Sequence, residues 1–240
     1  MLLCSGAIST RGNHAAAITR TIELIRPAQE LPAVAQPDLQ ARANEQRGRI
    51  LDAALTCFAR EGFHAATVQD IVEESGLSPG AIYGYFKGKT EIASAIASER
   101  HAMERRRMEF ALAAPDIDTS LRRLVEGFVL ELRSPKERRW RHLAVQLWAE
   151  SLSNPRLKRE ALAGVSQAVD VLAPMIAQAQ RQGRWPQHLD PPSAARVMVA
   201  VLQGISLQLA WDGRVDIERF AVALRIMLDP CSDGSGAAAG

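Results

Sequence analysis

The chain has few cysteines, and none of them stands at a spacing typical of metal ligands. Cys4, Cys57 and Cys231 are the three in 240 residues. No Cys-x-x-Cys or Cys/His ligand pattern is present, and the scattered histidines form no i, i+4 pair, so neither a metal site nor a cofactor is predicted. We expect Cys57, on the apolar face of a helix, to be a small core residue rather than a redox group. So few cysteines suit a reducing cytoplasm.

A strong charge of either sign is also lacking. The chain carries 29 Lys and Arg against 27 Asp and Glu, a net charge of +2. No general electrostatic attraction to nucleic acid is therefore predicted, and DNA binding would rest on individually placed groups such as Lys87 and Lys89. In residues 42–107, where a DNA-binding region is predicted below, ten basic and nine acidic residues give a net charge of only +1.

Long uninterrupted apolar runs are missing as well. The longest apolar stretch, residues 194–211, is broken by Arg196, Gln203, Gly204 and Gln208. The first twenty residues lack the basic start and long apolar run of a secretory signal. We therefore expect a cytoplasmic protein with no membrane partner. Because the motifs Gly-x-Ser-x-Gly, Walker A, His-Glu-x-x-His and the dinucleotide glycine fingerprint are absent too, an enzyme is not predicted.

What the sequence does contain is a pair of short helix signals between Thr67 and Lys89. Thr67 and Asp70 form a capping-box pattern, and Gly76 is suited to the left-handed conformation that ends a helix. Ser78 then caps a second helix with Pro79 at its first position. The short turn between them predicts a helix-turn-helix unit, which places the start of its second helix in the DNA major groove.

Helical periodicity continues through most of the chain and predicts an all-α fold. A first helix is expected from about Asn44 to Arg60, and a long one from Lys89 to the region of Pro115. We then expect helices at 118–132, 136–152, 155–182, 191–211 and 216–228. The predicted domains are an extension (1–44), a DNA-binding domain (45–90), an effector-binding and dimerisation domain (91–229) and a flexible tail (230–240). The extension is either an arm touching DNA through Arg42 and Arg47 or a disordered terminus.

The segment from Arg49 to Ile92, about 44 of the 240 residues, resembles the DNA-binding region of TetR (tetracycline-repressor-like) transcription regulators. The resemblance rests on helix lengths and on Gly62-Phe63, Thr67, Ile71, Gly76, Ser78, Ile82-Tyr83, Tyr85-Phe86 and Lys89. It implies a homodimer that binds a palindromic double-stranded DNA operator, most often as a ligand-responsive repressor. It also implies a variable carboxy-terminal domain that binds the effector. The rest of the chain is similar to the family only in size and helical texture.

The resemblance and the helix-turn-helix geometry together give the predicted DNA contacts. Gln69 suits adenine, Ala81 suits a thymine methyl group, and tyrosine hydroxyls can bind phosphates. Thr67 either caps its helix only or also contacts phosphate, and Tyr83 is either a core aromatic or a DNA contact. The full predicted set is Thr67, Gln69, Ser78, Pro79, Gly80, Ala81, Tyr83, Tyr85 and Lys89. Gly84, in the middle of a helix, stays unexplained.

Two further sets of residues are predicted in the carboxy-terminal domain. A small apolar or aromatic effector is expected to contact Met103, Phe128, Trp140, Trp148 and Met175, since apolar pockets between helices are common ligand sites. The last two helices would pair across a twofold axis through Val197, Val201, Ile205, Phe220 and Leu224. The basic run 133–142 is either a second DNA patch or a solvated helix start. Alternatives for the whole protein are a regulator controlled by a protein partner, and an all-helical enzyme or scaffold.

Overall fold

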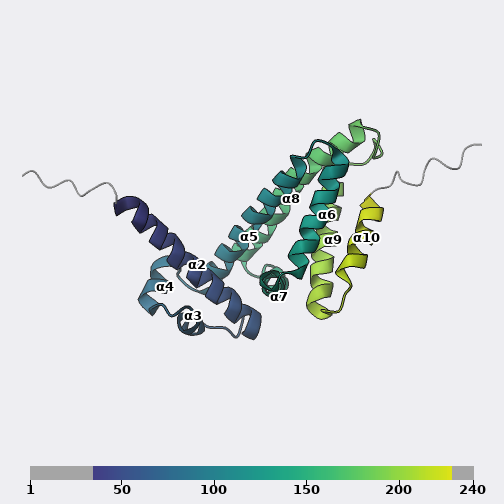
Figure 1. Cartoon of the computed structure of the whole chain (residues 1–240). Coiled ribbons are helices and arrows are strands. Elements are labelled where there is room, and N and C mark those ends of the chain that lie inside the picture. Colours follow the sequence, from purple (N-terminus) through teal and green to yellow (C-terminus); the bar gives the residue numbers. More distant parts are fainter. Residues whose placement is uncertain (1–34, 229–240) are drawn as a thin grey trace, which may run out of the picture. The chain divides into compact units, whose positions relative to one another are not determined.

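The structure is a computed structural model that describes residues 35–228, with side chains described for residues 40–227. Cys4, Cys231, the tail and most of the predicted extension lie outside the described residues. The chain divides into two compact units, residues 1–46 and 47–240. The described residues are helical and contain no strand, which confirms the predicted all-α class (Figure 1). The helices are α2 (Ala35–Glu61), α3 (Val68–Ser75), α4 (Pro79–Tyr85), α5 (Lys89–Leu112), α6 (Ile117–Arg133), α7 (Pro135–Glu150), α8 (Pro155–Arg181), α9 (Pro191–Trp211) and α10 (Ile217–Leu228).

The bounds of α3 to α10 agree with the sequence prediction to within a few residues, but α2 does not. It begins at Ala35 rather than near Asn44, inside the segment predicted to be an extension. Pro37 stands in its first turn, where a missing backbone N–H removes no intrahelical hydrogen bond, so proline does not prevent the helix from starting there. The other end of α2 matches the prediction, and Gly62 follows it with a positive φ of 86°.

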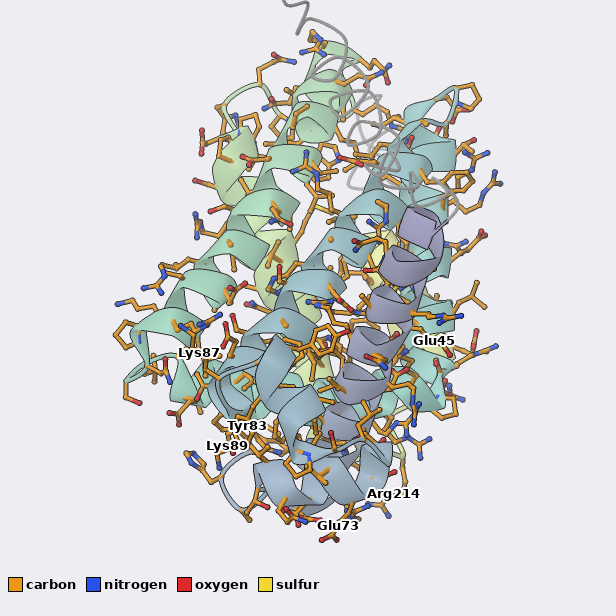
Figure 2. The ribbon with its side chains drawn as sticks, turned by 90° about the vertical axis from the view of Figure 1, so that its left-hand side faces the viewer. Glu45, Glu73, Tyr83, Lys87, Lys89 and Arg214 are labelled. Carbon is orange, nitrogen blue, oxygen red and sulfur yellow. The ribbon has the colours of Figure 1, made fainter. Side chains whose placement is uncertain are left out.

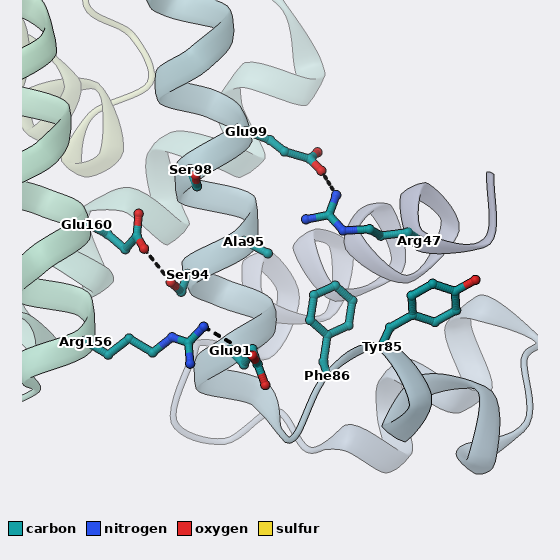
Figure 3. Close-up of a pocket in the computed structure, with 10 residues that line it drawn as sticks. All are labelled: Arg47, Tyr85, Phe86, Glu91, Ser94, Ala95, Ser98, Glu99, Arg156 and Glu160. Atoms are coloured by element: carbon teal, nitrogen blue, oxygen red, sulfur yellow. Dashed lines mark hydrogen bonds and ion pairs between the residues drawn. The ribbon is translucent and has the colours of Figure 1, made fainter. Parts of the chain in front are cut away.

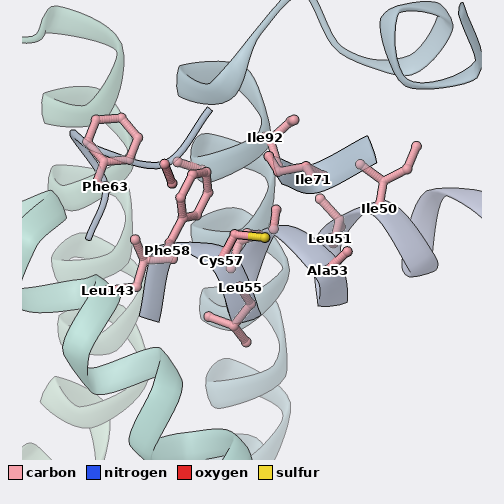
Figure 4. Close-up of a cluster of buried hydrophobic side chains, with 14 of the residues drawn as sticks. Ile50, Leu51, Ala53, Leu55, Cys57, Phe58, Phe63, Ile71, Ile92 and Leu143 are labelled. Carbon is pink, nitrogen blue, oxygen red and sulfur yellow. The ribbon is translucent and has the colours of Figure 1, made fainter. Parts of the chain in front are cut away.

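One buried cluster connects the amino-terminal helices of the second unit with α5, α7 and α8 (Figure 4). Phe58 of α2, Ile71 of α3 and Ile82 of α4 are fully buried in it. Leu143 of α7 and Leu157 of α8 belong to the same cluster. Cys57 is also buried there, and burial raises the pKa of its thiol, which agrees with the prediction of a core cysteine. The predicted DNA-binding segment therefore shares its core with helices more than fifty residues further along the chain.

Two smaller clusters lie in the carboxy-terminal helices. Ile117, Leu172 and Ile176 centre the first, and Leu132, Ile205 and Leu209 form the second. By length and composition alone, α8 and α9 are apolar enough to cross a membrane. The core helices of globular domains also pass that test, and both helices contribute buried side chains to these clusters.

A buried ionic cluster joins α5, α6 and α7, and the sequence analysis did not anticipate it. Arg100 is 7% exposed and pairs with the equally buried Glu137. Its other guanidinium nitrogens bind Glu104 at 2.8 Å and Glu131 at 3.0 Å. Nearby on α7, burial lowers the pKa of Arg141, whose Nη1 has no hydrogen-bond partner among the described residues. The positive charge of Arg100 thus offsets the negative charges of carboxylates from three helices.

Replacing Arg100 by methionine should lower the free energy of unfolding by about 3–5 kcal/mol, because the buried Glu137 would lose its ion-pair partner. Arg105→Met is the matched control, since Arg105 pairs with Glu109 at 2.8 Å but both side chains are about half exposed. That variant should change stability by less than about 1 kcal/mol. Urea unfolding followed by circular dichroism measures both, and equal effects would contradict the assigned role of Arg100.

Candidate nucleic-acid interface

The helix-turn-helix unit, Thr67–Tyr85, has the caps that the sequence predicts. Thr67 Oγ1 accepts a hydrogen bond from the Asp70 N–H at 3.2 Å, and Asp70 Oδ2 accepts from the Thr67 N–H at 2.7 Å. Gly76 ends α3 with φ of 65°, and Ser78 Oγ caps α4 by accepting from the Ala81 N–H at 3.2 Å. The Thr67 hydroxyl also donates to Asp70 at 2.7 Å, and these bonds lower the pKa of Asp70. Because its proton is used in the cap, Thr67 is better suited to capping than to phosphate binding.

The two short helices pack with their apolar faces inward and leave a polar, small-residue face outward. Ile71 and Ile82 are fully buried, which fixes how each helix is turned. Gln69, Ser78, Pro79, Gly80 and Tyr83 are exposed, and Ala81 is half-buried. A Cβ atom at Gly80 or at Gly84 would meet nothing within 4 Å. This face can therefore accept a close approach by another molecule.

The two tyrosines differ more than the sequence suggested. Tyr83 is 58% exposed and lies on the face of the molecule that Figure 2 shows. Tyr85 is half-buried, packs against the core, and its ring centroid lies 6.4 Å from that of Phe86. The structure thus favours Tyr83 as the more accessible hydroxyl, whereas the sequence analysis treated Tyr83 as the residue with a plausible core role.

Lys89 has a structural task that the sequence did not show. Its ammonium group donates to the backbone carbonyls of His64, at 2.6 Å, and Ala66, at 3.1 Å. It also lies 5.3 Å from the centre of the Phe63 ring, within cation–π distance. The first residue of α5 therefore holds the loop that leads into Thr67. Lys87, in contrast, has an exposed side chain, while its backbone N–H donates to Glu91 at 2.7 Å and lowers the pKa of that carboxyl group.

An open, polar pocket of about 360 Å³ lies where the end of α4 meets α5 and α8 (Figure 3). Arg47 pairs with Glu99 across it, and its guanidinium lies 5.7 Å from the centre of the Phe86 ring. On the other side Ser94 donates to Glu160 at 2.8 Å, and Arg156 of α8 reaches Glu91 at 3.3 Å. We call this region the α4–α5–α8 joint. Its polar contacts join α2 to α5 and α5 to α8, beside the end of α4.

One side of the basic run 133–142 is exposed to solvent, as predicted for a solvated helix start. Arg133, Lys136, Arg138 and Arg139 are exposed. The opposite side of the run is buried. Glu137 belongs to the ionic cluster, and Arg141 lies next to that cluster on the same helix. Lys136 also pairs with Asp52 of α2 at 2.9 Å. One face of this run therefore packs within the protein, which neither alternative had anticipated.

The predicted effector residues do not gather at one site. Trp140 and Trp148 line one small cavity between α5, α7 and α8. Met175 is buried in the cluster around Ile176, and Phe128 packs against the cluster around Ile205. Met103 lies half-buried on α5, where its sulfur is 3.7 Å from Arg107 Nη2. The structure therefore does not bring the five together in one cavity, because helical spacing does not tell which of several clusters an apolar residue joins.

The sequence also missed two polar residues that line the cavity with Trp140 and Trp148. These are His101 of α5 and Glu160 of α8. They lie on separate helices, far from each other and from the tryptophans in sequence. No local pattern connects them, so only the packing of the three helices reveals their proximity.

The predicted dimerisation residues divide into two groups. Val197 and Val201 are exposed on α9, but Ile205 and Leu224 are buried within the protomer, and Phe220 packs against the same cluster as Ile205. The prediction is thus corrected for Ile205 and Leu224, whose side chains already face their own core. Exposed apolar residues that the sequence analysis did not name continue along α9 and α10: Trp211, Val222, Ile226 and Met227.

Two protein-family models match the chain and together cover most of it. Residues 50–96 match the model described as bacterial regulatory proteins, tetR family. Residues 118–231 match the model described as BetI-type transcriptional repressor, C-terminal. The first match contains the helix-turn-helix unit, and the second contains α8, α9 and α10.

Individual relatives agree with these models. The uncharacterized HTH-type transcriptional regulator TtgW of Pseudomonas putida is 33% identical over 108 residues, which are 44% of this chain and 76% of that protein. The SmeT–triclosan complex, from Stenotrophomonas maltophilia, is similar with a TM-score of 0.63 and 25% identity, covering 77% of this chain and 91% of that chain. A putative transcriptional regulator from Saccharomonospora viridis in complex with choline gives a TM-score of 0.67 and 25% identity, covering 78% and 97%.

The two lysines at the end of the helix-turn-helix unit should respond differently to mutation. Lys89→Met should lower the free energy of unfolding by about 1–3 kcal/mol, because two charge-assisted hydrogen bonds to carbonyls are lost. Lys87→Met should change stability by no more than about 0.5 kcal/mol. Thermal unfolding of both variants tests this difference, and an unchanged stability for Lys89→Met would show that its two carbonyl contacts do not hold the loop.

Proposed function

Because this chain belongs to the TetR family of bacterial transcriptional regulators, we propose that it binds a palindromic operator as a homodimer and represses transcription until a small-molecule effector binds. It acts as a regulator and not as an enzyme. It works in the cytoplasm, where its DNA target lies. Both helices with membrane-like composition fall within residues 118–231, the match to a repressor domain.

The observation that carries the proposal is the outward face of the helix-turn-helix unit. Its second helix presents Pro79, Gly80 and Tyr83 to solvent while Ile82 anchors it from behind. Such a helix enters the major groove by its first turn, where small residues allow a close approach to base edges. Of the other predicted contacts, Thr67, Gln69 and Ser78 are exposed, and Ala81 and Tyr85 are half-buried. The ammonium group of Lys89 donates to the His64 carbonyl. We place Lys87 on the DNA backbone as a cation that the fold leaves exposed.

We propose dimerisation through α9 and α10. Val197 is 62% exposed, Ile226 60% and Met227 79%, although each is a large apolar side chain. Apolar surface of this kind is typical of a protein interface, and a twofold axis would bury it against the same residues of a second copy. The dimer would hold two helix-turn-helix units about 34–36 Å apart, one turn of DNA.

We further propose that the effector binds between α5, α7 and α8. Two solved relatives hold small molecules, triclosan in one and choline in the other, so proteins with this architecture bind ligands of different chemistry. Ligand binding would favour a spacing of the two helix-turn-helix units that no longer fits successive major grooves. Helix α5, which contributes both to the ligand cavity and to the core beneath the units, would transmit the change.

Footprinting on the DNA upstream of the protein's own gene tests the function, with random competitor DNA and several salt concentrations. We expect protection of two related half-sites. Gly80→Ala should leave stability unchanged or slightly raised, since its methyl group meets nothing in the free protein and alanine favours helix by up to about 1 kcal/mol. It should nevertheless lower operator affinity, because the methyl group would intrude between the helix and the bases.

Gly127→Ala of α6 is the matched control, because a Cβ atom there also has nothing within 4 Å and the site lies outside the helix-turn-helix unit. It should leave operator affinity unchanged. Weak binding that is equal for all sequences and is lost at moderate salt would argue against a specific operator. Equal affinity of the Gly80→Ala and wild-type proteins would remove the first turn of α4 from the interface.

A further inference from the structure

The cavity between α5, α7 and α8 has a definite chemical character. Its wall contains the indole side chains of Trp140 and Trp148, the imidazole of His101 and the carboxylate of Glu160. The remaining lining residues are apolar. The residues that line it include neither lysine nor arginine. Glu160 is therefore the one acidic side chain among the lining residues.

His101 does not offset this negative charge at neutral pH. Burial lowers the pKa of its imidazole below the ordinary value of 6.5, against the opposing pull of the carboxylates of Glu104 and Glu160. A neutral imidazole leaves the cavity with a net negative lining. The ring also lies close to α8, because a Cβ atom at Gly164 would come within 2.5 Å of His101 Nε2. The glycine thus permits close packing of α5 and α8 next to the cavity.

Resting on the proposed function, we propose that the effector is a small organic cation, such as a tertiary or quaternary ammonium compound, bound between Trp140, Trp148 and Glu160. Indole faces attract cations through their quadrupole, and a carboxylate adds a full charge of the opposite sign. An anionic effector would instead face Glu160 without a compensating cation. The sequence predicts an apolar or aromatic effector. The acidic lining of the cavity is the reason for proposing that the effector also carries a positive charge.

Entry of such a ligand requires the three helices to rearrange. The cavity has a volume of only about 20 Å³, room for little more than one water molecule. The half-buried side chains of Trp148 and His101 must therefore move when a larger group enters. In our proposal the site is closed in this structure, and a bound ligand would stabilise a more open arrangement of the three helices.

Glu160 connects the cavity to the α4–α5–α8 joint. The same residue lines both the cavity and the joint pocket, where Phe86 and Tyr85 also lie. The Glu160 carboxylate accepts a hydrogen bond from the Ser94 hydroxyl at 2.8 Å (Figure 3). A cation that attracts this carboxylate into the cavity would weaken the bond to Ser94, one of the contacts that hold α8 to the first turns of α5. Ligand binding would thereby loosen the support of the helix-turn-helix unit.

The test is calorimetric titration of the full-length protein with three para-substituted phenols, of which the first two have nearly the same shape. They are 4-hydroxyphenyltrimethylammonium, its uncharged isostere 4-tert-butylphenol, and the anion 4-hydroxybenzoate. The cation should bind at least about tenfold more tightly than the isostere, and the anion should not bind. Glu160→Gln keeps the shape and a hydrogen-bond acceptor for Ser94 but removes the charge, and it should weaken cation binding by about tenfold.

Asp170→Asn is the matched control, since it removes one negative charge from an exposed position of the same helix that does not line the cavity. Its cation affinity should equal that of the wild type. Trp148→Leu, which keeps an apolar wall without the indole, should weaken the cation more than the isostere. If Glu160→Gln does not fold, the Trp148→Leu variant and the comparison of the three probes on the wild-type protein still test the inference.

Equal affinity of the protein for the isostere and the cation would overturn the inference. Absence of binding by all three probes at about 1 mM would also overturn it. Operator titration of the same preparation separates this failure from failure of the proposed function. Operator binding that persists without any cation effect overturns only the ligand class. Loss of operator binding upon adding the cation, but not the isostere, supports the inference.

Discussion

A single hydrophobic core couples the helix-turn-helix unit to the helices that follow it. Phe58, Ile71 and Ile82 pack in the same cluster as Leu143 of α7 and Leu157 of α8. The Phe63 N–H also donates to Gln146 of α7 at 2.6 Å. Short helices such as α3 and α4 are marginal by themselves, so most of their stability must come from this burial. The DNA-facing surface is therefore held by residues outside the DNA-binding segment.

This coupling gives a physical basis for regulation. A close-packed core transmits displacement, because its side chains have no free volume to absorb it. Movement of α5 or α8 at the proposed ligand cavity would then shift the support of α4, either through the shared core or through the polar contacts of Glu160 and Arg156 at the joint. The two routes end on the same element, α5. The buried pairing of Arg100 with Glu137 further binds α5 to α7.

The local features of the fold could be predicted from the sequence, whereas the long-range contacts could not. Thr67, Gly76 and Ser78 act on residues within one turn, so their caps are visible as sequence patterns. The pairings of Lys89 with His64 and of Arg100 with Glu137 join residues far apart in the chain, and charge alone does not identify such partners. The same reason explains why Trp148 was predicted at the ligand cavity without Glu160, and why Ile205 was assigned to an interface instead of its own core. DNA contacts at Gln69 and Tyr83 stay predictions, because exposure permits a contact without proving it.

The coupling through the shared core is the central claim, and native-state hydrogen exchange on Leu143→Ala tests it most directly. Leu143 is fully buried in α7, and its truncation should cost about 2–5 kcal/mol. The account predicts that amides in α3 and α4 lose protection by a similar free energy, together with those of α7. Full protection of α3 and α4 alongside a loosened α7 would contradict it, and would mean that the helix-turn-helix unit is stabilised independently.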